Sequence, residues 1–320
     1  MNIDKIMTDG LAFALPLFIM AIGGIYSERS GVTMLSIEGF QGFGAFTGAI
    51  TVVILRTVMG SSPTWLIYIA TLTAMLGGML LALLNALMVI KLKSKMTIAG
   101  VVINILAVAL TSFLSSVITG AVTGQGTNKI QLGVSPRYTI PYLSKIPVIG
   151  GLFQNVYPFA FIIIVVALLA WYVMYRTSYG LRLRAGGDNP HSLDAAGVDV
   201  NKIRFSAVVL AGGFAGLGGI AFTYTMATFS PSSYVGYGYL AIAALIFGNW
   251  NIMTTFWTSM FFGFSRSFSY ELVNELGLSS NYSDLFSIMP YVLTLVVLIF
   301  FSKHNRPPRA LGEHFDKGKR

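Results

Sequence analysis

Long apolar segments separated by short polar connections constrain this chain more than any other feature of its sequence. A helix needs about 20 mostly apolar residues to cross the hydrocarbon core of a bilayer. Lys, Arg, Asp and Glu make up only 10% of the 320 residues, whereas a soluble domain carries about a quarter. The apolar side chains must therefore face lipid. Because lipid offers no partner for free backbone groups, we predict an all-α, polytopic transmembrane helical bundle.

Nine segments are long or apolar enough to be candidate spans. The first, seventh and eighth are short or interrupted by glycine, so we expect about nine spans. The candidates are Leu11–Tyr26, Val32–Leu55, Thr64–Ile90, Thr97–Thr119, Tyr157–Tyr175, Phe205–Ala227, Tyr234–Trp250, Ile252–Ser265 and Leu285–Phe301.

Lys and Arg are concentrated in alternate connections, and this asymmetry predicts the orientation. Arg29, Lys91–Lys95, Arg176–Arg204 and the chain after residue 302 hold 15 of the 21 basic residues. Cytoplasmic connections carry the excess of Lys and Arg. We therefore predict a multi-pass protein of the inner (cytoplasmic) membrane, with the N-terminus outside and the C-terminus in the cytoplasm. The predicted parts are one transmembrane domain (1–303) with an external loop (120–156) and a cytoplasmic loop (176–204), then a basic, solvated cytoplasmic tail (304–320).

The composition also excludes several classes of function. No cysteine is present, and the three histidines are His191, His304 and His314, no two of which share a helix turn. Thiol chemistry is excluded and a metal centre is not expected. The net charge is +9. The basic residues that produce it lie between the apolar runs, which indicates membrane topology and not nucleic-acid binding. We find no paired carboxylates and no nucleophile with a nearby base, so a membrane-embedded enzyme is not expected.

A short helix is predicted inside the cytoplasmic loop. Asn189 is a favourable N-cap, Pro190 suits the first helical position and Gly197 suits the end. Leu193 and Ala196 share one face of this helix. So short a helix gains little stability by itself when it is exposed to water. We interpret it as a docking element for another protein, with an ordinary capped loop helix as the alternative.

Four segments resemble, in the same order, the permease subunits of ABC importers of the ribose and branched-chain amino acid class. The segment around Glu28 to Phe46 is similar to the nucleoside and simple-sugar branch. The segments are Glu28-Arg-Ser-Gly with Ile37-Glu-Gly39 and Gly44-Ala-Phe46, then Gly180–Ile203, Leu210–Gly219 and Gly236–Gly248.

The resemblance implies a machine of several chains. A second permease (another copy or a homologous chain) would complete the channel, a cytoplasmic ABC ATPase would use ATP and Mg, and an extracytoplasmic solute-binding protein would deliver solute. No phosphate-binding Gly-x-x-x-x-Gly-Lys-Ser/Thr loop occurs in this chain, which is therefore expected to bind no cofactor of its own. Its predicted partners also include membrane lipid but not nucleic acid. The resemblance places the ATPase-coupling residues at Arg182, Arg184, Asp188, Asn189, His191, Leu193 and Asp194.

The sequence leaves the solute open. The branch usually has Asn-Ile-Gly-Ile-Glu-Gly where this chain has Met34-Leu-Ser-Ile-Glu-Gly39. A nucleoside, a simple sugar or a ribityl compound such as riboflavin would each fit the resemblance. The alternative function is an ATP-independent secondary transporter or channel. Such a protein needs ionisable groups inside the membrane, and Glu38 is the only carboxylate clearly within a predicted span.

Polar residues on consecutive predicted spans reach a similar depth nearer the cytoplasm. Measured from the ends of their spans, Glu38, Asn85 and Asn104 lie about 9, 8 and 10 Å in. Gln41 follows Glu38 by three residues and shares its face. We interpret these residues as a polar layer that either ties the helices together or forms an inner gate.

Glycines and aromatic residues mark the sixth and seventh predicted spans. Gly212 and Gly216 have the spacing that lets helices approach closely. Tyr224, Phe229 and Tyr237 flank the start of the seventh span. They either stack against a planar solute or belong to the interfacial aromatic belt. We also assign Trp65, Trp171 and Trp250 to that belt.

Overall fold

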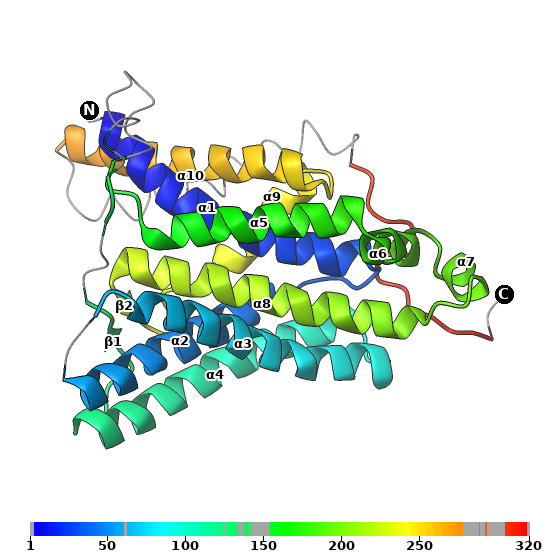
Figure 1. Ribbon diagram of the computed structural model, residues 1–320, viewed down its shortest axis with the longest axis horizontal. Helices are drawn as coiled ribbons and strands as arrows, with labels where there is room; N and C mark the ends of the chain where they lie inside the picture. The colour runs from blue at the N-terminus through cyan, green and yellow to red at the C-terminus, as the bar shows by residue number, and fades with distance from the viewer. Residues whose placement is uncertain are drawn as a thin grey trace.

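The computed structural model describes residues 3–60, 63–124, 126–133, 137–139, 141, 154–277, 288, 292 and 305–318. Long helices run side by side along the long axis of the molecule, and the shorter α6 and α7 lie beyond one end (Figure 1). The helices are α1 (Ile3–Arg29), α2 (Ile37–Met59), α3 (Leu66–Ala86) continued by the π-helix η1 (Leu87–Lys91), α4 (Met96–Thr123), α5 (Pro158–Arg176), α6 (Ser178–Asp188), α7 (Pro190–Ala195), α8 (Val200–Met226), α9 (Tyr237–Phe247) and α10 (Ile252–Glu275).

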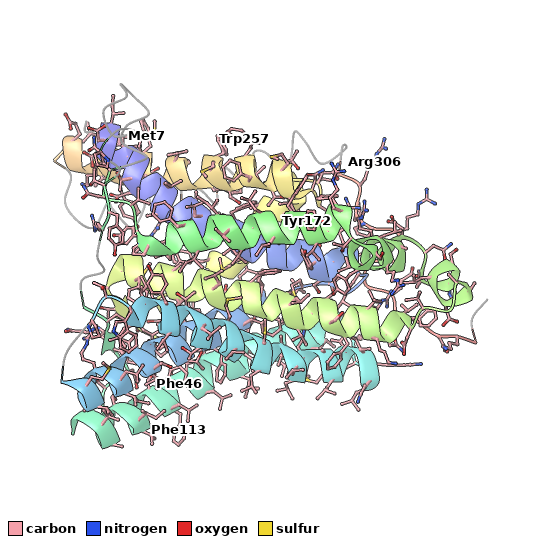
Figure 2. All side chains as sticks on the ribbon, viewed as in Figure 1. Met7, Phe46, Phe113, Tyr172, Trp257 and Arg306 are labelled. Atoms are coloured by element: carbon pink, nitrogen blue, oxygen red, sulfur yellow. The ribbon has the colours of Figure 1, made fainter. Side chains whose placement is uncertain are left out.

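Six of the described helices are long and apolar enough to cross a membrane, namely α1, α2, α3 with η1, α4, α5 and α8. Large apolar side chains such as Phe113 on α4, Tyr172 on α5 and Trp257 on α10 project outward and are more than half exposed (Figure 2). Such side chains suit contact with lipid tails. The prediction of an all-α, polytopic bundle is therefore confirmed.

The number of spans stays a prediction. α9 has only 11 residues, and α10 has 24 residues but several polar ones. The last predicted span, Leu285–Phe301, lies almost wholly outside the described residues. α10 also continues past Arg266, beyond the predicted end of the eighth span at Ser265.

The centre of the bundle is the contact of α8 with α1, α2 and α3. Backbones approach very closely here because glycines leave room. A Cβ atom on Gly216 would lie 2.1 Å from the backbone oxygen of Ala74, and one on Gly78 would lie 2.1 Å from that of Gly212. The prediction that Gly212 and Gly216 form a close helix contact is therefore confirmed.

The seventh predicted span, Tyr234–Trp250, is wrong as a continuous helix. After α8, strand β2 (Thr228–Phe229) pairs antiparallel with β1 (Ile130–Gln131). Gly236 then has φ +96° and only α9, Tyr237–Phe247, is helical. A left-handed backbone cannot continue an α-helix. α9 is consequently a half-length helix whose first turn lies inside the bundle, against α2.

Candidate functional site

A polar layer joins α2, α4 and the start of α9. Glu38 lies in the first turn of α2, where its Oε2 accepts a hydrogen bond from the Gly236 amide at 2.8 Å. Asn104 on α4 accepts from the Gly39 amide at 2.8 Å and donates to the Leu35 oxygen at 2.9 Å. The first amides of a helix have no acceptor within the helix, and lipid offers none. A carboxylate at the start of α9 supplies this acceptor. Glu38 and Asn104 therefore hold the half-helix α9 and the α4 helix against α2.

α3 reaches the same layer through Asn85, whose Nδ2 donates to the Ser36 hydroxyl at 3.0 Å. The structure thus brings the three predicted polar residues together from three consecutive helices. The predicted depth of Glu38 is wrong, because α2 begins at Ile37 and not near Val32. The residues between them form turns, so the layer includes backbone groups as well as side chains.

Gln41 lies outside this layer although it shares a helix face with Glu38. It is fully buried, and a Cβ on Gly219 would lie 2.2 Å from its backbone oxygen. Among the described residues, neither side-chain amide atom has a hydrogen-bond partner. These surroundings are those of a packing residue between α2 and α8.

Tyr239 belongs to the layer, and the sequence analysis missed it. The Asn104 Nδ2 donates to its hydroxyl at 3.2 Å, yet the side chain is 45% exposed. The sequence pattern favours Tyr237 instead, because Tyr237 lies near the start of the seventh predicted span, Tyr234–Trp250. Two residues apart on a helix, the two tyrosines face different sides. Tyr239 is thus an exposed residue whose hydroxyl contacts an otherwise buried layer.

The predicted aromatic residues divide between two places. Phe229 lies in a stack with Tyr234, at 6.3 Å between ring centres, and near Phe46 at 6.0 Å. The Tyr234 hydroxyl is 3.4 Å from the Thr111 hydroxyl on α4. Tyr224 is buried near the end of α8. Phe229 is therefore on the α2–α4 side of the bundle.

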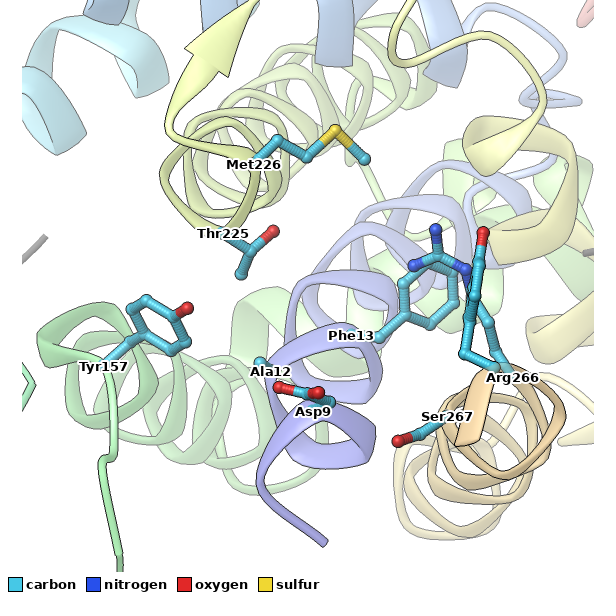
Figure 3. Close-up of a pocket in the computed structure, with 9 residues that line it drawn as sticks. Asp9, Ala12, Phe13, Tyr157, Thr225, Met226, Arg266 and Ser267 are labelled. Atoms are coloured by element: carbon cyan, nitrogen blue, oxygen red, sulfur yellow. The ribbon is translucent and has the colours of Figure 1, made fainter. Parts of the chain in front are cut away.

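Tyr237 lies on the other side, where it contacts Arg266, a lining residue of a pocket of about 270 Å³ between α1, α8 and α10. Arg266 donates to the Tyr237 hydroxyl at 2.9 Å, and its guanidinium lies 4.1 Å from the ring centre of Phe13. Figure 3 shows Asp9 and Arg266 on different walls of this pocket. Tyr157, at the start of α5, is another lining residue. The lining also includes Ala12, Thr225, Met226, Ser267 and Tyr270.

A larger pocket of about 860 Å³ lies between α2, α4 and residues 126–131. Most of its lining residues are polar, including Arg56, Thr57, Ser116, Thr119 and Lys129. The Arg56 guanidinium donates to the backbone oxygen of Leu132. This pocket and the polar layer share the helices α2 and α4, at opposite ends.

We expect Glu38→Gln to keep the protein folded, because an amide oxygen still accepts the Gly236 hydrogen bond. Glu38→Ala removes that acceptor and leaves a buried amide unpaired, which costs about 1–3 kcal/mol. We therefore expect Glu38→Ala, and not Glu38→Gln, to lower the thermal midpoint of the detergent-purified protein by several degrees. If the two variants have the same thermal midpoint, Glu38 does not hold the helices together. If Glu38→Gln is stable but does not support solute uptake, the polar layer is instead an inner gate.

The predicted docking helix is present as α7, at the end of the molecule away from the N-terminus (Figure 1). Asn189 caps it by accepting from the Ser192 amide at 3.1 Å, Pro190 is the first helical residue and Gly197 follows with φ +79°. A second helix, α6, precedes it and was not predicted. Thr177 caps α6 by accepting from the Gly180 amide at 3.3 Å.

The predicted coupling residues lie on several surfaces of α6 and α7. Arg182, Asp188, Asn189 and His191 are exposed. Arg184 instead turns back onto its own helix, donating to the Gly180 oxygen at 3.4 Å. α7 therefore presents a small exposed surface on a rigid, capped support.

Leu193 needs a correction, because it faces inward. The side chain is only 6% exposed and packs with Val200 and Phe315. Phe315 belongs to the predicted solvated tail and is buried, together with Pro308 and Ala310, whereas most other described residues of 305–318 are exposed. Asp194 forms an ion pair with Lys317 at 3.3 Å. Burial of a Leu or Phe side chain stabilises by about 1.5–3 kcal/mol, whereas an exposed ion pair is worth about 0–1 kcal/mol.

The described residues form a polytopic helical bundle with the half-helix α9 inside it and the capped helix α7 beyond one end (Figure 1). Comparison with known proteins gives the family. Residues 6–298 match the family model for the permease component of branched-chain amino acid transport systems. The chain belongs to this family. It is accordingly a multi-pass transport subunit of the inner membrane and not an enzyme.

Two relatives cover almost the whole chain, and a third covers part of it. It is 36% identical to the guanosine ABC transporter permease NupQ of Bacillus subtilis, over 97% of this chain and 96% of that protein. It is 35% identical to the nucleoside ABC transporter permease NupC of Lactococcus lactis, over 99% and 98%. The ribose import permease RbsC of Escherichia coli K12 is 30% identical over 42% of each chain. The chain is thus similar over almost its full length to ABC transporter permeases.

Proposed function

We propose that this chain forms the translocation path of an ATP-driven nucleoside importer. One observation carries the proposal: similarity over almost the full length to permeases named for guanosine and for nucleosides. The ribose permease matches over less than half of its length. A nucleoside is therefore the preferred solute, with simple sugars and riboflavin as the alternatives.

The proposed path runs along α4 from the larger pocket to the polar layer. Asn104, Thr111, Ser115 and Thr119 follow one another at spacings of 7, 4 and 4 residues, which places them on one helix face. All four are buried. Their hydroxyl and amide groups suit the hydroxyl groups of a ribose. The rings of Phe229 and Tyr234 lie beside this face, where a planar base could stack.

The proposed energy source is a partner ABC ATPase that binds ATP and Mg and presses on α7. The orientation stays as predicted, with α7 in the cytoplasm. Residue 3 and residues 305–318 lie at opposite ends of the molecule (Figure 1), as an odd number of spans requires. A second permease and an extracytoplasmic solute-binding protein complete the proposed importer.

The test is uptake of labelled guanosine by cells that lack their own nucleoside importers. The cells would express this chain with its ATPase, second permease and binding protein. We expect uptake that is abolished by a substitution in the phosphate-binding loop of the ATPase. Unlabelled nucleosides should compete, and ribose and riboflavin should not. Competition by ribose or riboflavin alone would overturn the solute assignment. Uptake that persists without ATP hydrolysis would favour the secondary transporter.

A further inference from the structure

The C-terminal tail, residues 305–318, is bound to the docking helix through both side chains and charges. Phe315 is 7% exposed and packs with Leu193 of α7 and Val200 of α8. Its ring centre lies 5.4 Å from that of His191. Lys317 adds the ion pair with Asp194 at 3.3 Å. Both Phe315 and Lys317 of the tail therefore contact α7.

The same tail is bound to the end of α1 by its backbone. The Ala310 amide donates to the Gly187 oxygen of α6 at 2.8 Å, and the Gly312 amide donates to the Gly31 oxygen at 3.0 Å. α6 itself lies directly on this turn, since a Cβ on Gly187 would lie 2.2 Å from the Arg29 oxygen. The tail thus connects α7 and α6 to the turn between α1 and α2.

Arg204 joins these segments at their centre. Its side chain is only 2% exposed. The guanidinium donates from Nε to the Ser30 oxygen at 3.0 Å and from Nη1 to the Glu313 oxygen at 2.6 Å. A buried guanidinium needs such acceptors, because an uncompensated buried charge is costly. Arg204 therefore fixes the tail to the α1–α2 turn and to α8 at once.

We propose that the tail is part of the ATPase-coupling device, and that Phe315 is its main positioning residue. This inference rests on the proposed function, in which α7 receives the force. A helix of six residues cannot hold its own position against a load. The tail makes α7 continuous with the turn that leads into α2, and α2 begins with the polar layer at Glu38. Displacement of α7 would thereby reach the proposed path through packed contacts.

The experiment compares point variants in the complete importer, with its ATPase, second permease and binding protein, in proteoliposomes. Point changes are preferable to truncation, because truncation would also remove the Glu313 acceptor of Arg204. We expect Phe315→Ala to lower the solute imported per ATP hydrolysed by at least about fivefold, the lower end of typical coupling between linked sites. Phe315→Leu keeps an apolar side chain there and should restore most of the ratio. A purely structural role would lower import and hydrolysis together and leave the ratio unchanged.

Charge variants provide the matched control. Lys317→Glu should lower the ratio less than Phe315→Ala does, because the exposed ion pair with Asp194 contributes little. Lys202→Glu is the control, since Lys202 is exposed on the same surface and pairs with Asp199; it should leave the ratio unchanged. If the wild type is ATP-driven and Phe315→Ala has the wild-type ratio, the tail proposal is overturned and the proposed function stands. A wild type without ATP-driven import would overturn both.

Discussion

Gly216→Val is expected to abolish the folded transporter. A Cβ atom at this position would lie 2.1 Å from the backbone oxygen of Ala74 and 3.4 Å from the Cα of Gly78. Extra atoms in a well-packed core cost about 1–3 kcal/mol even where side chains can adjust. Here the obstacle is the backbone of α3, so α8 and α3 would have to separate along their contact. Fluorescence-detected size-exclusion chromatography of a fusion protein should show loss of the monodisperse peak.

Alanine substitutions give a graded control for the same contact. Gly216→Ala and Gly78→Ala should each lower the thermal midpoint, because one added methyl group already overlaps backbone atoms. Gly120→Ala in α4 is the matched control, since its Cβ would lie 3.5 Å from its nearest neighbour, an ordinary contact. Helix propensity favours alanine over glycine by about 1 kcal/mol, so Gly120→Ala should be neutral or stabilising. Equal stability of all three variants would contradict a close α3–α8 contact.

Ala195→Trp on α7 is expected to uncouple the importer without unfolding it. Ala195 is exposed on the docking helix, so a larger side chain there meets nothing within the chain's own packed core. It would prevent α7 from entering a cleft of the proposed ATPase. We expect solute-stimulated ATP hydrolysis and uptake to fall by at least about tenfold, within the usual range of coupling between sites. The measurement is ATPase activity of the reconstituted complex with and without solute-loaded binding protein.

Lys91→Trp is the control for this substitution. Lys91 is also exposed at the predicted cytoplasmic end, at the end of η1 rather than on α7. It should leave both activities near the wild-type values. If Ala195→Trp has wild-type uptake and solute-stimulated ATP hydrolysis, α7 is not the docking element. This conclusion does not depend on the result for Lys91→Trp. Unfolding of Ala195→Trp would instead show that its surface is packed.

Periodic and local signals account for the parts of the fold that were predicted correctly. Runs of apolar residues identified the long helices α1, α3, α4, α5 and α8, because every backbone group in lipid must bond within its own helix. The cap of α7 was equally predictable, since Asn189, Pro190 and Gly197 act on their immediate neighbours. The small-residue spacing of Gly212 and Gly216 also indicated a close contact. Each of these signals depends on residues within one or two turns.

The errors occur where a distant residue decides the outcome. Trp250 was assigned to the interfacial belt, but it is 5% exposed and donates from Nε1 to Glu28 Oε2 at 2.5 Å. Leu193 was assigned to the docking surface, but Phe315, far along the chain, covers it. Tyr239 was passed over because its partner Asn104 lies on another helix. No pattern within a helix indicates these partners.

The sequence by itself determined the membrane, the helical class, the capped docking helix and the family resemblance, because composition, periodicity and capping act locally. Only the tertiary structure decided that α9 is a half-helix whose N-cap amide donates to Glu38, and that Gln41 packs outside the polar layer. It also decided that the tail packs against α7. The physical reason is the same in each case. A buried carboxylate, amide or ring is placed by whichever group from another segment completes its hydrogen bonds or fills its surroundings.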